Sequence, residues 1–187
     1  MFKKPVIVLL TVFIMASIGN AEEIGGIAMP DSLAAGQARL ILNGAGLRTK
    51  FFMSLYVGGL YLAQKNVDAG RVVEADEPMA IRLHIISSHI TSEKMETATR
   101  EGFEKSTNGN TAPVKAQIEN FITVFKDKIN ENDIYDFVYI PNRGLEIYKN
   151  AKLKSLIEGL AFKQALFGIW LSDKPAQKSL KEEMLGK

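Results

Sequence analysis

Residues 42–62 read LNGAGLRTKFFMSLYVGGLYL. Two apolar runs of strand composition are joined here by a turn that we expect to be short and polar. Arg48 ends the first run and Tyr56 lies inside the second, with glycines flanking both. An unpaired charge is costly to bury, so Arg48 in this apolar setting needs either a carboxylate of the protein or an anionic ligand.

The second run, residues 51–62, is apolar on both of its alternating faces, as is typical of a central strand covered on both sides. Strands and helices then come in separate runs, and Thr91 is expected to cap the first long helix. This pattern indicates the α+β class, with a large antiparallel sheet and a layer of helices packed on one face, an open-faced sandwich. Further strands are expected over residues 24–29, 39–43, 79–87, 135–140, 145–148 and 153–157, and helices over 91–103, 113–125, 162–171 and 179–185.

Residues 1–21 have the pattern of a secretory signal peptide. Lys3 and Lys4 precede an apolar run over residues 6–18, which is short for a membrane span, and small residues follow up to Ala21. We therefore expect residues 22–187 to form a single exported domain, periplasmic if the source is a double-membraned bacterium. The alternative is that the run stays uncleaved as a membrane anchor.

The composition restricts the classes of partner. The chain has no cysteine, so it can form neither a disulfide framework nor an acylated lipoprotein terminus. It has 23 basic and 21 acidic residues, and removal of Lys3 and Lys4 leaves 21 of each. A neutral chain lacks the concentrated basic surface that nucleic acid binding requires. No second apolar stretch is long enough to span a membrane after signal cleavage.

Motifs for cofactor or metal chemistry are absent from the sequence. His84 and His89 are the only histidines, and no third ligand joins them at a useful spacing, so no metal site is expected. Gly44 and Gly46 do not form a dinucleotide fingerprint, because a third glycine and a following helix are missing. No G-x-S-x-G nucleophile motif occurs. We therefore expect no cofactor.

Arg48 and Tyr56 are the remaining candidates for function, and two interpretations stay open. In the first they line a cleft, where the guanidinium binds a carboxylate or enolate oxygen and the phenol donates a second hydrogen bond. In the second, Arg48 lies in solvent at the end of a strand and Tyr56 is a core residue.

The stretch over residues 43–63, NGAGLRTKFFMSLYVGGLYLA, resembles the signature of the chalcone isomerase-like superfamily, in particular its bacterial exported branch. The ending over residues 157–186, IEGLAFKQALFGIWLSDKPAQKSLKEEMLG, is similar to the ending of the same branch. This resemblance implies a large antiparallel sheet, helices on one face and a ligand cleft between them. The superfamily includes plant enzymes that close a flavanone ring, plastid proteins that bind fatty acids, and non-catalytic relatives that modulate other enzymes.

Carried over residue by residue, the resemblance matches Arg48 to the arginine that steers the reacting phenolate in the isomerases. Tyr56 stands where the isomerases have a threonine and where the fatty-acid-binding relatives have a tyrosine beside the arginine. The other isomerase positions have no matching catalytic side chain here; they fall near Thr91, Ala98, Phe162 and Lys163.

Three functions follow from this resemblance. The preferred one is non-catalytic binding of a small amphipathic, fatty-acid-like acid by Arg48 and Tyr56. Thr91 is a third ligand-binding candidate, unless its hydroxyl is used to cap its helix. The first alternative is an intramolecular lyase or isomerase of chalcone-like enones, with Arg48 as its electrostatic catalytic residue. The second alternative is an interaction module for another exported protein, with a vestigial cleft.

Overall fold

The computed structural model describes residues 22–187, so the expected signal peptide lies outside the described residues. In the main antiparallel sheet, neighbouring strands are consecutive in the chain. Its seven strands are β3 (Ser32–Ala35), β4 (Ala38–Lys50), β5 (Met53–Leu62), β6 (Met79–Ile85), β7 (Ile134–Ile140), β8 (Gly144–Lys149) and β9 (Lys152–Ile157). A separate hairpin is formed by β1 (Glu22–Ile24) and β2 (Ile27–Met29).

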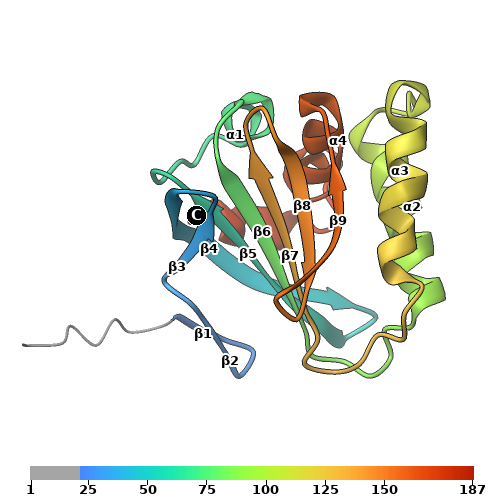
Figure 1. Ribbon diagram of the computed structural model, residues 1–187. Helices are drawn as coiled ribbons and strands as arrows, with labels where there is room; N and C mark the ends of the chain where they lie inside the picture. Colours follow the sequence, from blue (N-terminus) through green and yellow to red (C-terminus); the bar gives the residue numbers. More distant parts are fainter. Residues whose placement is uncertain (1–21) are drawn as a thin grey trace, which may run out of the picture.

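The helices confirm the expected α+β class (Figure 1). They are α1 (Ala69–Glu74), α2 (Ser92–Ser106), α3 (Lys115–Ile122), α4 (Leu160–Leu171) and α5 (Lys178–Met184), with short 3₁₀ helices η1 (Ala112–Val114) and η2 (Thr123–Phe125) next to α3. Thr91 caps α2 as expected, because its Oγ1 accepts a hydrogen bond from the Lys94 amide at 3.2 Å. Within residues 22–187, no helix is both long and apolar enough to cross a membrane.

Two apolar cores lie on opposite faces of the sheet. The larger one is between the sheet and the helices, and includes Phe103, Phe121 and Phe162. The smaller one lies on the other face, where residues of β4 to β7 pack with Met29 of the β1–β2 hairpin. Strand β5 contributes to both, which confirms that it is covered on both sides. Figure 1 shows the hairpin on the side of the sheet away from α2 and α3.

Two expectations for the strands are wrong. Residues 24–29 do not form one strand, because Gly25 and Gly26 take positive φ angles of 58° and 80° and turn the chain into the β1–β2 hairpin. The turn between β4 and β5 is not polar, because it consists of Phe51 and Phe52. Both phenylalanines are exposed to solvent. The apolar run therefore begins in the turn, two residues before the strand.

The glycines of the first apolar run, Gly44 and Gly46, allow α5 to pack closely against β4. A Cβ on Gly44 would lie 2.9 Å from the Gly186 nitrogen and would also collide with the Glu183 carbonyl oxygen, so α5 lies directly on the β4 backbone. The side chain of Asn43 fixes the end of this helix, since its Nδ2 donates to the Met184 carbonyl oxygen at 2.9 Å. The sequence feature flanking Arg48 thus serves helix packing.

Candidate ligand-binding cavity

The pairing of β4 with β5 places Arg48 directly opposite Tyr56. Opposite residues of an antiparallel pair project from the same face of the sheet, which here is the face toward the helices. Tyr56 is buried and Arg48 is half-buried. Burial raises the pKa of Tyr56, and the Trp170 hydrogen bond and the Arg48 charge oppose that shift without cancelling it. Tyr56 is therefore a neutral phenol at neutral pH, with a cation beside it.

The hydroxyl of Tyr56 is oriented by the only tryptophan in the sequence. Trp170, on α4, donates from Nε1 to the Tyr56 hydroxyl oxygen at 3.0 Å, and both groups are buried. A hydroxyl donates one hydrogen bond and can accept two. Within residues 22–187 the Tyr56 proton has no acceptor. The phenol is thus held in place with its donor left for a ligand.

Arg48 has neutral partners and no acidic one. None of the ion pairs within residues 22–187 involves it. Its Nη1 donates to the Thr49 carbonyl oxygen at 2.7 Å and to Oε1 of Gln177 at 3.0 Å. Gln177 is fixed in turn, because its Nε2 donates to the Leu47 carbonyl oxygen at 3.1 Å. This amide positions the guanidinium without neutralising its charge.

A cavity of about 740 Å³ lies against Arg48, Tyr56 and Trp170. Its volume falls within the range of about 300–1,000 Å³ that is typical of small-molecule sites. An apolar cavity with a cation and a phenol in its wall suits a molecule with a hydrocarbon body and an acidic head. Most of the remaining inner wall is apolar and comes from Leu83, Ile90, Met95, Phe121, Phe125, Phe137, Leu166 and Ile169.

The other positions matched to the isomerases fall into two groups. Thr91 and Ala98 line the cavity. The Thr91 oxygen accepts the capping bond of α2, which uses one of its two acceptor positions, and Ala98 offers no polar side chain. Phe162 and Lys163 do not line the cavity, because both are fully buried elsewhere in the core.

Trp170 and Gln177 are the site residues that the sequence did not reveal. The helical spacing of residues 162–171 predicts Trp170 as a core residue, and it is buried, but spacing along one helix does not say which side chain its Nε1 meets. The general need of a buried tryptophan for a hydrogen-bond acceptor is the only available signal. Gln177 lies 129 residues from Arg48, and nothing local marks it.

The two histidines do not share a site. His89 is exposed and lines the cavity, whereas His84 lies on β6 and does not line it. Within residues 22–187, no group of three or more metal-ligating side chains comes together.

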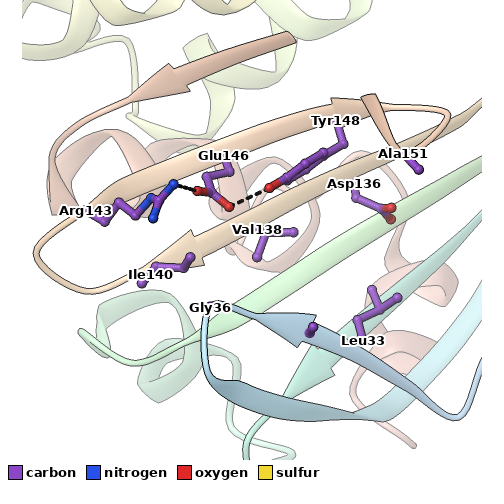
Figure 2. Close-up of a pocket in the computed structure, with 10 residues that line it drawn as sticks. Leu33, Gly36, Asp136, Val138, Ile140, Arg143, Glu146, Tyr148 and Ala151 are labelled. Atoms are coloured by element: carbon purple, nitrogen blue, oxygen red, sulfur yellow. Dashed lines mark hydrogen bonds and ion pairs between the residues drawn. The ribbon is translucent and has the colours of Figure 1, made fainter. Parts of the chain in front are cut away.

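A second hollow lies on the opposite face of the sheet (Figure 2). Its polar groups neutralise one another: Glu146 pairs with Arg143 at 2.6 Å and accepts from the Tyr148 hydroxyl at 2.7 Å. Asp136 is held by Arg82 through two hydrogen bonds of 2.6 and 2.8 Å. With these charges already paired, this hollow is a weaker candidate than the cavity at Arg48.

Comparisons with known proteins agree with this architecture. A crystal structure of a fatty-acid binding protein of Arabidopsis thaliana is similar with a TM-score of 0.70 and 20% sequence identity, over 86% of this chain and 92% of that chain. At this identity, the similarity establishes a common fold. No curated protein sequence matches the chain. A family model described as chalcone isomerase-like matches residues 21–186. The chain therefore belongs to the chalcone isomerase-like family.

Proposed function

We propose that this protein is an exported, non-catalytic carrier of a small amphipathic acid of the fatty-acid type. The observation that carries the proposal is a half-buried arginine with no acidic partner, set opposite a buried phenol in the wall of a large apolar cavity. The ligand carboxylate would accept hydrogen bonds from Arg48 and from the Tyr56 hydroxyl. The acyl chain would lie against the phenylalanines of α3, η2 and β7.

Further support comes from the fold. The Arabidopsis protein with a similar structure is a fatty-acid binding protein. Each methylene group removed from water contributes about 0.8 kcal/mol, so the apolar wall supplies affinity that rises with chain length. Arg48 supplies the selection for an acid over an alcohol or ester of the same length, because a planar guanidinium matches a carboxylate. Export rests on the sequence pattern of residues 1–21, and membership of a bacterial exported branch rests on the resemblance of residues 43–63 and 157–186.

Binding can be measured with the protein's own fluorescence. Because Trp170 is the only tryptophan and lines the cavity, its emission should change as a saturated fatty acid is titrated in. We expect Arg48→Ala to weaken binding at least about tenfold, since hydrogen bonds to charged groups contribute about 1.5–3 kcal/mol. Arg39→Ala is the matched control, because Arg39 is exposed on the same strand and does not line the cavity.

Native mass spectrometry of protein purified gently from its own host identifies the natural ligand. A bound acyl chain that is lost in Arg48→Ala supports the carrier proposal. Equal fatty-acid affinity in Arg48→Ala and the parent would overturn the role given to Arg48. Loss of chalcone absorbance on incubation with the protein, abolished by Arg48→Ala, would instead establish the isomerase alternative.

A further inference from the structure

The turn between β4 and β5 exposes two neighbouring aromatic side chains. Phe52 is 108% exposed and Phe51 is 78% exposed, so neither is packed into the fold. Both have positive φ angles, of 64° and 50°, a conformation that bulky residues rarely adopt. A two-residue turn between antiparallel strands favours positive φ at both positions, where Asn and Gly are the usual residues, so two phenylalanines are unusual there. We call Phe51 and Phe52 the aromatic tip.

Phe51 of the aromatic tip is exposed and lines the cavity, so the cavity reaches the surface beside this turn. Lys50, Phe51 and Met53 line the cavity, whereas Phe52 is not part of its wall. Arg48, the proposed carboxylate partner, is three residues before Phe51 on the same hairpin. A ligand that enters beside this hairpin therefore passes the aromatic tip before it reaches Arg48.

Cations outnumber anions among the exposed residues that line the cavity. Besides Arg48, three exposed lysines border the cavity, whereas two exposed glutamates do so. The Lys50 Nζ lies 5.6 Å from the centre of the Phe51 ring, so a cation and an aromatic face are presented together. The exposed charged residues of the lining are Lys50, Lys94, Lys105, Glu93 and Glu101.

We propose that the aromatic tip docks this protein on an anionic lipid bilayer, with the cavity entrance facing the membrane. Aromatic rings reside favourably at the headgroup level, and lysines beside them attract anionic headgroups. The proposal rests on the proposed function, because it supplies the route by which a sparingly soluble acyl chain enters the cavity. A protein partner is a poorer fit, since specific protein interfaces bury about 800 Å² on each side, far more than two side chains provide.

The test measures partition of the protein onto vesicles by sedimentation. Vesicles of phosphatidylcholine alone are compared with vesicles of phosphatidylcholine and phosphatidylglycerol in equal parts, with the chain in the form that its host produces. We expect binding to the mixed vesicles that falls with added salt. Phe52→Ser should weaken this partition at least about tenfold, because it removes one inserted ring.

Val67→Ser is the matched control. Val67 is 54% exposed, lies in the loop after β5 and is not part of the cavity wall. This variant should partition like the parent. Equal partition of Phe52→Ser and the parent, or failure of the parent to bind the mixed vesicles, would overturn the docking proposal. So would a dimer of the parent that Phe52→Ser dissociates, because a second copy would then be the occupant of the tip.

Fatty-acid titration in the absence of vesicles separates the two proposals. Because Phe52 does not line the cavity, Phe52→Ser should bind a soluble medium-chain fatty acid with the parent's affinity, while its uptake from mixed vesicles slows. If the parent binds vesicles but no fatty acid, the proposed function fails and the docking stands. If the parent binds fatty acid but no anionic vesicle, the docking proposal fails and the proposed function stands.

Discussion

At the scale of single residues, the hydroxyl of Tyr56 can both accept and donate a hydrogen bond. It accepts the indole proton of Trp170 inside the protein, and Tyr56 itself lines the cavity. Arg48 has a comparable position, because Gln177 holds it in place while its charge stays unpaired. Both groups are thus fixed before a ligand arrives, which lowers the entropic cost of binding.

We expect Tyr56→Phe to lower the unfolding free energy by about 1–3 kcal/mol, because the Trp170 N–H would be left buried without an acceptor. Urea denaturation followed by tryptophan fluorescence measures this loss. Tyr135→Phe is the control: its hydroxyl is also buried but has no hydrogen-bond partner within residues 22–187, so its removal should be close to neutral. Equal losses in the two variants would contradict the importance of the indole bond.

Lys163 makes stability depend on pH. It is fully buried, its Nζ donates to the carbonyl oxygens of Val72, Val73 and Ala75, and burial lowers its pKa to about 8. The unfolded chain keeps this proton up to the ordinary value of 10.5, so it binds more protons than the folded chain between the two values. The unfolding free energy should therefore rise with pH from about 8 toward 10, by no more than about 3 kcal/mol.

Urea denaturation at a series of pH values checks this expectation. Lys163→Met removes the titrating group, so the variant should be less stable than the parent and lack this rise. The informative quantity is the difference between the pH-dependent rise in the parent and that in Lys163→Met, because other lysines and tyrosines also lose protons in this pH range. A rise of the same size in both would show that Lys163 is not its source.

At the scale of elements, the contact of α5 with β4 joins the end of the chain to the strand that carries Arg48. Glu183 accepts a hydrogen bond from the Leu47 amide at 3.1 Å, and Gln177 precedes the same helix. The helix therefore covers β4, and its N-terminal end places Gln177 beside the guanidinium of Arg48. Its removal would disturb the site as well as the fold.

We expect Gly44→Ala to destabilise the protein by about 1–3 kcal/mol, because the added methyl group meets the backbone of α5. Hydrogen exchange should become faster in residues 178–184 than elsewhere. Gly58→Ala is the control on the neighbouring strand, since its Cβ would lie 3.5 Å from Leu180, an ordinary contact. If both variants exchange alike, α5 does not depend on close approach at Gly44.

Features that depend on local sequence patterns could be predicted, whereas contacts between distant residues could not. Periodicity located the sheet, the long helices and the Thr91 cap, because these depend on local patterns. It assigned Arg48 and Tyr56 to one hairpin, and antiparallel pairing then put them opposite each other. It failed for Gln177, which reaches Arg48 across 129 residues, and for the turn, because an exposed Phe51 and Phe52 oppose the usual polarity of turns.

At the scale of the whole molecule, a ligand that binds only the folded state raises its stability. A saturated fatty acid present at 100 times its dissociation constant should add about 2.7 kcal/mol. For a chain of this size, that corresponds to a rise in melting temperature of roughly 5–10 °C. Calorimetry of the parent with increasing ligand measures the rise, and Arg48→Ala should show a smaller one at the same concentration. A melting temperature that fatty acid leaves unchanged in the parent would count against the carrier proposal.

The order of strands in the sheet also determines how the chain assembles. Neighbouring strands are consecutive in the chain, so the sheet can grow from β3 to β9 as the chain emerges. The hydrogen bond between Glu183 and Leu47 instead spans 136 residues, and closing so long a loop carries the larger entropic cost. While residues 177–187 are still being synthesised, Arg48 consequently lacks its contact with Gln177. The candidate site is complete only once α5 has packed on β4.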